Sequence, residues 1–257
     1  AITNKDRIGS TLKSLKDFLI HAKLYDYYRD GNRSFIPLFF IAYHLFHKDL
    51  GTKPLSVFFD NFDSGNSDYP LMYEWVYHSL LNGVFRSRGA GWVAYKTGVR
   101  KLLVEMKKHK NKNFPKNELF NVYIEHPVVF SESYDAYNLD NLDRSFLYYL
   151  MYDRNQTIRT QDVDHIMPKS ILGSLSYGWD EINSVKNFQL IDYGTNRGTK
   201  NGKPFKEWMD KDVADKSAFV KRHLIPKNES LWDESMFQVF TQERAVLMLD
   251  KVSKYLP

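Results

Sequence analysis

The chain has 257 residues, of which 43% are hydrophobic and 16% aromatic, and its formal net charge is +5. This composition is typical of globular proteins and excludes an intrinsically disordered chain, while the length suits one large or two small domains. No apolar run reaches the ~20 residues that a transmembrane helix needs, and the absence of cysteine excludes disulfides and thiolate zinc sites.

The start of the sequence has no secretory signal, so we expect a cytoplasmic protein in a reducing compartment. Because the first residue is not methionine, we also expect the chain to continue a longer polypeptide with further domains upstream. The positive charge permits a polyanionic partner such as DNA without identifying one.

Residues 1–153 have the apolar spacing of α-helices and are predicted to form a helical domain. Ile8, Leu12, Leu15 and Leu19 recur at three- and four-residue steps, which is typical of an amphipathic helix. The apolar run from Phe35 to Phe46 predicts a buried helix that begins near Pro37. Further helices are predicted over residues 71–84, 92–106 and 139–152, whereas residues 114–133 show no clear pattern.

Two features of this region have competing interpretations. The basic residues between Lys96 and Glu118 can bind a polyanion, but a solvated helix face explains them better. His44 and His47, three positions apart in a very apolar stretch, can form a metal pair, but packed helix histidines are favoured because no carboxylate has a suitable spacing nearby.

The pattern changes after Asn155, and residues 154–257 are predicted to form a second domain. Residues 157–166 and 188–191 are predicted to be two antiparallel strands, and a helix is expected to begin at Asn196. Later helices are predicted over residues 204–209, 217–224 and 241–256. The predicted fold class is therefore mainly α with a small module made of a short hairpin and a helix.

The second domain carries a constellation suited to phosphodiester hydrolysis. Histidine, with a free pKa near ~6.5, can take a proton from water, and His165 lies near the end of the first predicted strand. Mg²⁺ prefers oxygen ligands and retained waters. Asp164 and Asn196 are therefore predicted to bind Mg²⁺ (or Mn²⁺), with His165 as general base.

Adjacent strand residues point to opposite faces, so Asp164 and His165 can serve one phosphate only if the strand ends there. We therefore predict irregular backbone at residues 164–166. Asn187 is predicted to brace the loop after the first strand and to help fix the His165 ring. Arg197 and Lys200, which follow Asn196, are predicted to bind phosphate.

These residues also have simpler interpretations. Lys200 can be an ordinary solvent-exposed charge. His165 can be a packed strand histidine, and the two asparagines can be turn formers.

The segments Asp162-Val163-Asp164-His165-Ile166 and Asn187…Asn196-Arg197-Gly198 resemble the His-Asn-His/Asn (HNH) nuclease site, including the one embedded in RNA-guided CRISPR nucleases. The layout is more similar to the C-terminal HNH-like domain of GmrSD-type modification-dependent restriction enzymes and their SspE-type antiphage relatives. In that group a helical region precedes the nuclease.

The resemblance covers about 45 residues. It implies a ββα-metal module that cleaves or nicks DNA in restriction-modification or antiphage defence. His165 would be the general base, Asn187 the central asparagine, and Asp164 and Asn196 the metal ligands. Lys186 departs from the glycine that this group favours, and the Asp-Gly-Gln-Gln-Arg-type motif of the group's sensor domain is absent. We therefore expect a nucleotide-hydrolysing sensor domain to lie upstream.

Two other classes of function remain open. An HNH-shaped module can recognise DNA or a partner without cutting. A secreted nuclease toxin with an immunity partner is disfavoured by the missing export segment and the long helical region.

Overall fold

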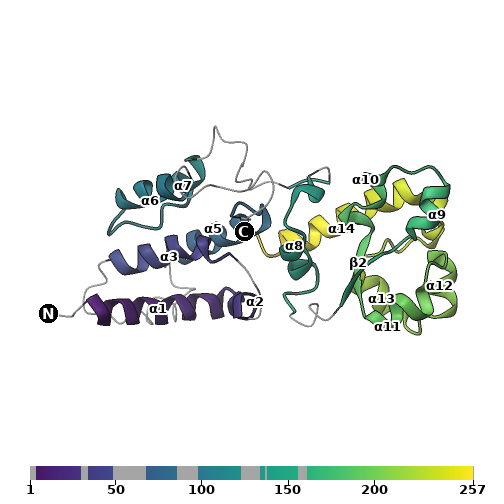
Figure 1. Ribbon diagram of the computed structural model, residues 1–257, viewed down its shortest axis with the longest axis horizontal. Helices are drawn as coiled ribbons and strands as arrows, with labels where there is room; N and C mark the ends of the chain where they lie inside the picture. The colour runs from purple at the N-terminus through teal and green to yellow at the C-terminus, as the bar shows by residue number, and fades with distance from the viewer. Residues whose placement is uncertain are drawn as a thin grey trace. The chain divides into compact units, whose positions relative to one another are not determined.

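The chain is shown as a computed structural model in Figure 1, and the structure describes residues 4–29, 34–48, 68–85, 98–122, 134–136, 138–155 and 161–256. These residues are mainly helical and include a two-stranded antiparallel hairpin, as the sequence predicts. The chain divides into two compact units, Ala1–Glu132 and Ser133–Pro257. This boundary precedes the one predicted at residues 153 and 154, so residues 133–153 belong with the C-terminal unit.

The N-terminal unit is helical throughout its described part. Its helices are α1 (Asn4–His21), α2 (Tyr25–Arg29), α3 (Ile36–His47), α5 (Asp68–Leu81), α6 (Arg100–Lys107) and α7 (Lys116–Asn121). Helix α3 has Pro37 in its first turn, where a missing N–H costs no hydrogen bond, and α5 confirms the helix predicted near residues 71–84. The beginning of the helix predicted over residues 92–106 lies outside the described residues.

His44 is a packed histidine, as the sequence favours. It is buried in α3, and its Nε2 lies 3.4 Å from a carboxylate oxygen of Asp68, the first residue of α5. Asp68 also accepts hydrogen bonds from Lys48 and from the backbone N–H of Phe114. Sequence spacing did not reveal this carboxylate because it reaches His44 from another helix.

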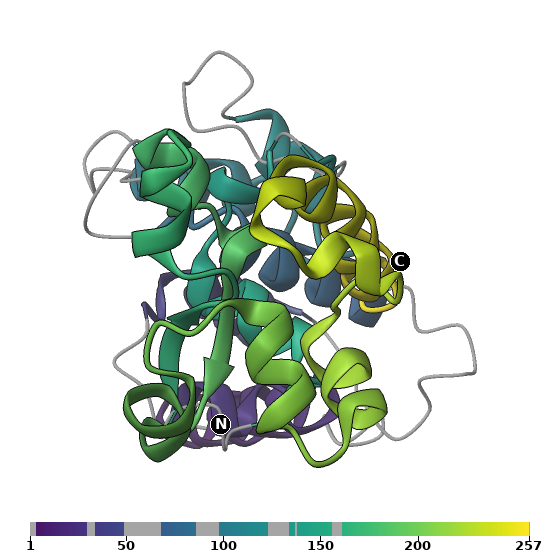
Figure 2. The same ribbon diagram turned by 90° about the vertical axis from the view of Figure 1, so that its right-hand side faces the viewer.

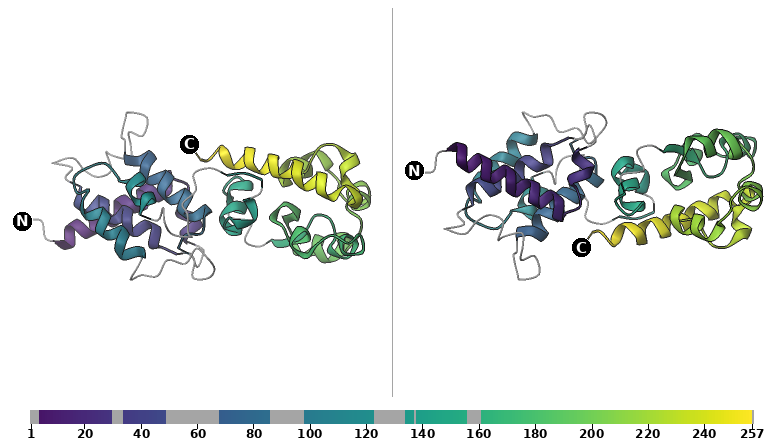
Figure 3. Two further views of the ribbon diagram at one scale, coloured as in Figure 1. Left: turned by 90° about the horizontal axis from the view of Figure 1, so that it is seen from above. Right: turned by 90° about the horizontal axis from the view of Figure 1, so that it is seen from below.

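The C-terminal unit surrounds the hairpin with short helices. Its elements are η3 (Leu139–Asn141), α8 (Arg144–Met151), β1 (Asp162–His165), α9 (Lys169–Ser174), α10 (Trp179–Ile182), η5 (Val185–Asn187), β2 (Phe188–Ile191), α11 (Tyr193–Thr195), η6 (Asn196–Lys200), α12 (Phe205–Lys211), α13 (Lys216–His223), η7 (Glu229–Trp232), η8 (Glu234–Met236) and α14 (Phe237–Ser253). In Figure 2 the hairpin lies among the green and yellow helices of this unit, and Figure 3 shows α14 extending along the unit beside α8.

The two strands pair in register from Asp162 opposite Ile191 to His165 opposite Phe188. The second strand has the predicted bounds, and the described part of the first lies inside its predicted range. The strand stays regular through His165, and the backbone bends only at Ile166 and Met167. The irregular backbone predicted for residues 164–166 is therefore wrong at residues 164 and 165, where strand pairing continues, and is confirmed at Ile166, whose N–H donates to the Asn187 carbonyl at 2.7 Å.

The core of this unit is formed by the turn after β1 and by the surrounding helices. Its buried apolar side chains include Ile166, Met167, Phe205, Trp208, Trp232 and Phe240. The helix predicted to begin at Asn196 is a π-helix that directly follows α11 and ends at Lys200, and its C-cap residue Asn201 has a φ of +28°. No helix in the described part of the chain is both long and apolar enough to cross a membrane.

Candidate functional site

The segment η6 returns to strand β1, which carries Asp164 and His165. Asp162 and Asp164 alternate along β1 and so share one face of the hairpin. Asn196, the first residue of η6, donates its amide to the Asp162 carboxylate at 3.4 Å. Asp192 caps the turn before η6 by accepting the Thr195 N–H at 2.9 Å. A capped turn therefore brings Asn196 back to the strand that carries Asp164 and His165.

His165 is half-buried, and its ring is held in one orientation. Its Nε2 lies 3.1 Å from the side-chain oxygen of Asn183, and the Asn183 amide nitrogen donates to the Trp179 carbonyl at 2.8 Å. This second hydrogen bond fixes the orientation of the Asn183 amide, so its oxygen faces the His165 ring. Because that oxygen can only accept, His165 Nε2 must carry a proton and donate it. The lone pair of neutral His165 is therefore on Nδ1.

The surroundings of His165 favour its neutral form. Burial lowers the pKa of His165 below its ordinary value, and the nearby Lys200 and Lys169 cations lower it further. The hydrogen bond to Asn183 and the charge of Asp164 act in the opposite direction but do not outweigh these effects. At neutral pH the imidazole is therefore uncharged, which is the state that a general base requires.

Asn187 braces the turn between β1 and α9, as predicted. Its side chain is fully buried; the oxygen accepts the Met167 N–H at 3.0 Å, and the nitrogen donates to the carbonyls of Met167 and Ile182 at 3.2 and 3.1 Å. The His165 ring, which Asn187 was also expected to fix, is instead oriented by Asn183, a residue that the sequence interpretation missed.

Lys200 points inward. Its side chain is 3% exposed, and the ammonium donates to the Asp164 carboxylate and to the His165 carbonyl. Gln189 also donates to the same Asp164 oxygen, at 2.9 Å. Burial lowers the pKa of Lys200, although the charge of Asp164 opposes that change. The interpretation of Lys200 as a solvent-exposed charge is therefore wrong, and a contact with phosphate would require it to leave Asp164.

Carboxylate and amide oxygens are the kind of ligand that a hard cation prefers, but the side chains at this site do not form a complete set of metal ligands. Among the described residues, no group of three His, Cys, Asp or Glu side chains is placed to hold a metal ion. Asp162, Asp164 and Asn196 nevertheless bring two carboxylates and one amide to the same end of the module. A divalent cation at Asp164 would have to share or displace the contact with Lys200.

Arg197 differs from Lys200 because its side chain is exposed. The guanidinium carbon lies 4.4 Å from the centre of the Tyr193 ring, so the cation is supported from one side while its N–H groups remain accessible. This position, next to Asn196, is compatible with the predicted phosphate contact.

Arg244 is a further site-building residue that the sequence interpretation missed. Its guanidinium is fully buried and donates to the carbonyls of Val185, Lys186 and Phe188 at 3.2, 2.7 and 2.7 Å. It also contacts the His223 carbonyl through two nitrogens, at 3.3 and 3.1 Å. Arg244 thus ties α13 and α14 to the backbone on both sides of Asn187. The sequence does contain a signal of this burial: Arg244 lies four residues after Phe240 and four before Met248, on the apolar face of the helix.

Comparison with protein-family models and with curated proteins finds no match to this chain. The functional proposal therefore depends on the chain's own residues and their arrangement.

Proposed function

We propose that the C-terminal unit is an HNH-like ββα-metal endonuclease domain that nicks or cleaves DNA. The observation that carries the proposal is that β1 holds Asp162, Asp164 and His165 within four residues, and that η6 returns to this strand, with Asn196 at Asp162 and Lys200 at Asp164. The resemblance of these segments to the HNH site of restriction and antiphage enzymes points to the same chemistry. The biological role that follows is that of a defence effector.

His165 supplies the base in this proposal. Its Nδ1 carries the free lone pair because Nε2 donates to Asn183, and its lowered pKa keeps it neutral near pH 7. A water molecule that gives its proton to Nδ1 becomes the nucleophile that attacks phosphorus. Asn187 acts through the backbone of the turn, so we assign it a positioning role.

Asp164 and Asn196, with Asp162 beside them, are the residues that would hold Mg²⁺ or Mn²⁺. A bound divalent cation would neutralise phosphate charge and stabilise the departing 3′ oxygen. Arg197 supplies an accessible cation for the strand's phosphates, a contact that is independent of base sequence.

A plasmid relaxation assay tests the proposal. We expect the wild-type chain to convert supercoiled plasmid to the open-circular form with Mg²⁺ or Mn²⁺, and His165→Ala to lose this activity by roughly 100-fold or more. His21→Ala, which changes an exposed histidine of α1, is the matched control. Equal nicking by wild type and His165→Ala would remove His165 from the mechanism.

One observation favours a second candidate, a DNA-binding or partner-binding module with an HNH-like shape. The Lys200 ammonium already donates to Asp164 and to the His165 carbonyl, so these acceptors have a partner without a divalent cation. DNA binding by the wild type without nicking under any divalent cation would support this candidate over the nuclease.

A further inference from the structure

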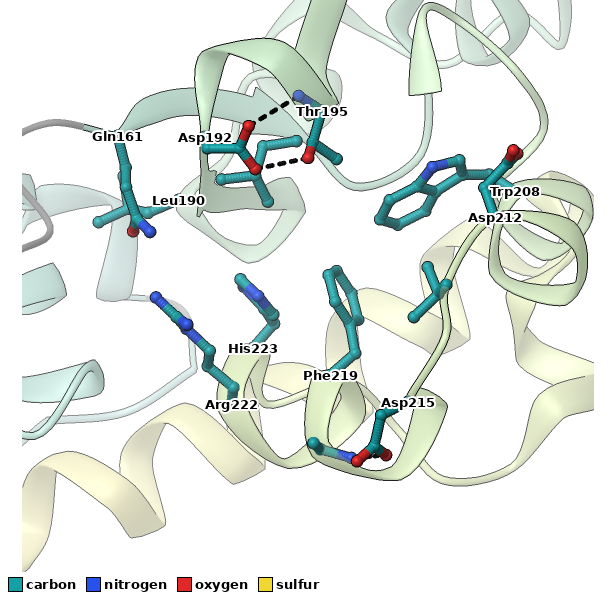
Figure 4. A pocket seen from close by; sticks show the side chains of 13 residues that line it. Gln161, Leu190, Asp192, Thr195, Trp208, Asp212, Asp215, Phe219, Arg222 and His223 are labelled. Atoms are coloured by element: carbon teal, nitrogen blue, oxygen red, sulfur yellow. Dashed lines mark hydrogen bonds between the residues drawn. The ribbon is translucent and has the colours of Figure 1, made fainter. Parts of the chain in front are cut away.

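A pocket of about 350 Å³ lies beside the candidate site in the C-terminal unit (Figure 4). Its aromatic wall comes from Trp208, Phe219 and His223. The Trp208 and Phe219 rings meet edge to face at 5.2 Å, and the Phe219 and His223 rings stack at 4.1 Å. The volume lies at the lower end of the range for small-molecule sites, about 300–1,000 Å³. The pocket therefore suits a small planar ligand.

Polar groups surround this aromatic wall. The Gln161 side-chain oxygen is buried and has no hydrogen-bond partner among the described residues. The exposed Arg222 guanidinium lies at the rim, on the same helix as Phe219 and His223 (Figure 4). Arg222 provides several donors beside the aromatic rings.

His223 adds one more donor. The Tyr152 hydroxyl accepts the Leu190 N–H at 3.0 Å and lies 2.9 Å from His223 Nδ1, so it donates its own proton to that nitrogen. Burial and the nearby Arg244 charge lower the pKa of His223 to about 3, which keeps the ring neutral. The remaining ring proton is therefore on Nε2, in a side chain that lines the pocket.

The acidic residues of the pocket are largely engaged elsewhere. Asp215 caps α13 by accepting the Ala218 N–H at 2.9 Å, and Asp212 pairs with Lys203 at 2.8 Å. Asp192 is occupied by Thr195. Lys203 balances the charge of Asp212, and Arg222 remains as an accessible cation.

The pocket and the candidate site share a wall. Gln161 lines the pocket and directly precedes Asp162, while Thr195 lines it and directly precedes Asn196. Trp208 also separates the pocket from the buried Lys200, whose ammonium lies 5.8 Å from the centre of the indole ring. The pocket is therefore lined by the residues that directly precede Asp162 and Asn196 in the chain.

We propose that this pocket binds an unstacked nucleobase whose attached phosphate lies toward Arg222 at the rim. Aromatic side chains bind bases by stacking or edge contacts, and donors and acceptors at the rim contact the base edge. The assignment of the base to a DNA strand rests on the proposed nuclease function, whereas base binding itself does not.

Filling the pocket tests the proposal. Ala218 lines the pocket and is exposed, so Ala218→Leu adds bulk there without removing a buried group, and Ser217→Leu makes a similar change at a neighbouring exposed position of α13 that does not line the pocket. Binding is measured by fluorescence anisotropy in the presence of a chelator, with a short oligothymidylate and an abasic strand of equal length and charge.

We expect the wild type and Ser217→Leu to bind the intact strand roughly 5- to 100-fold more tightly than the abasic strand. Ala218→Leu should lose this preference while keeping the same circular dichroism spectrum. Arg222→Gln should weaken binding of the intact strand several-fold, and Lys221→Gln, the neighbouring charge change outside the pocket, should weaken it less. Equal affinity of the wild type for intact and abasic strands, or an unchanged preference in Ala218→Leu, overturns the proposal.

Two further measurements distinguish a free nucleotide from a base within a strand, and distinguish failure of the pocket proposal from failure of the nuclease proposal. If thymidine 5′-monophosphate competes with an affinity equal to that of the strand, the pocket is a site for free nucleotides. If it competes more weakly than the strand, the pocket is a site for a base within a strand. Both outcomes support base binding. Plasmid nicking by the wild type without any base preference rejects the pocket and leaves the nuclease intact. Base preference without nicking rejects the nuclease alone.

Discussion

Replacement of Arg244 tests how the C-terminal unit is held together around Asn187. The guanidinium makes five N–H···O contacts of 2.7–3.3 Å with four main-chain carbonyls. Burial lowers the pKa of Arg244 to about 10, which still leaves the group charged at neutral pH. The partners of Arg244 are main-chain carbonyls. If Arg244 is replaced, these carbonyls lose their donor, and a second side-chain substitution cannot remove them.

The structure sets the expected size of the effect. A hydrogen bond to a charged group contributes about 1.5–3 kcal/mol, whereas burial of the cation costs several kcal/mol. Arg244→Met would leave four buried carbonyls without this donor, at about 1–3 kcal/mol each, and would remove the cost of burying the cation, so we expect the free energy of unfolding to fall by about 3–5 kcal/mol. Arg244→Lys keeps the charge but places its N–H groups on one nitrogen, so a loss of about 2 kcal/mol is expected.

Urea unfolding followed by tryptophan fluorescence measures these losses, since Trp208 and Trp232 are buried in the core of the same unit. Hydrogen exchange at the amides of residues 185–190 reports the local effect. Arg222→Lys makes the same chemical change at an exposed position of α13 and should alter stability by less than about 0.5 kcal/mol. A loss below about 1 kcal/mol in Arg244→Met would show that the carbonyls find other partners and that Arg244 does not organise the turn.

Three further predictions follow from buried polar groups. Asn187→Ala should reduce nicking and raise hydrogen exchange at Met167, and unchanged values of both would contradict its bracing role. Lys200→Met leaves Asp164 without its ammonium partner, so it should lower the melting temperature and increase the stabilisation by added Mn²⁺ relative to the wild type; an identical response to Mn²⁺ in both proteins would exclude a cation site at Asp164. Burial raises the pKa of Asp68, but hydrogen bonds from His44 and Lys48 outweigh it and hold the pKa at about 2. Since this folded-state pKa lies below the unfolded value, the stabilisation of about 2 kcal/mol is present above pH ~4 and is lost as the pH falls toward 2; acid unfolding curves of the wild type and Asp68→Asn that remain parallel would contradict it.

The sequence predicted the elements that depend on local signals. The strand from Phe188 to Ile191 has its predicted bounds because a short apolar run lies between turn-forming residues. Pro37 marks the start of α3 because proline is compatible with the first turn of a helix. The bracing role of Asn187 could also be predicted, since a buried amide can pair with a backbone donor and acceptor at once.

The sequence did not predict contacts between residues far apart in the chain. Arg244 reaches the carbonyls of residues 185–188 only after α14 packs against η5, and Lys200 becomes buried only when Trp208 and Asp164 enclose it. Asn183 resembles any polar turn residue until the hairpin brings His165 to its side-chain oxygen. Long polar side chains are the hardest to assign, because the same residue type serves solvent, phosphate or a buried partner.

The charges at the candidate site indicate how cation and substrate binding depend on each other in the proposed nuclease. Asp162 and Asp164 bring two negative charges, and Lys200 balances one of them from a buried position. Adding a divalent cation while Lys200 remains would leave an excess positive charge, which is unfavourable in a partly buried site. A phosphodiester supplies one negative charge and removes that excess. The divalent cation should therefore bind more tightly in the presence of DNA than in its absence, and by linkage DNA should bind more tightly with the cation than without it.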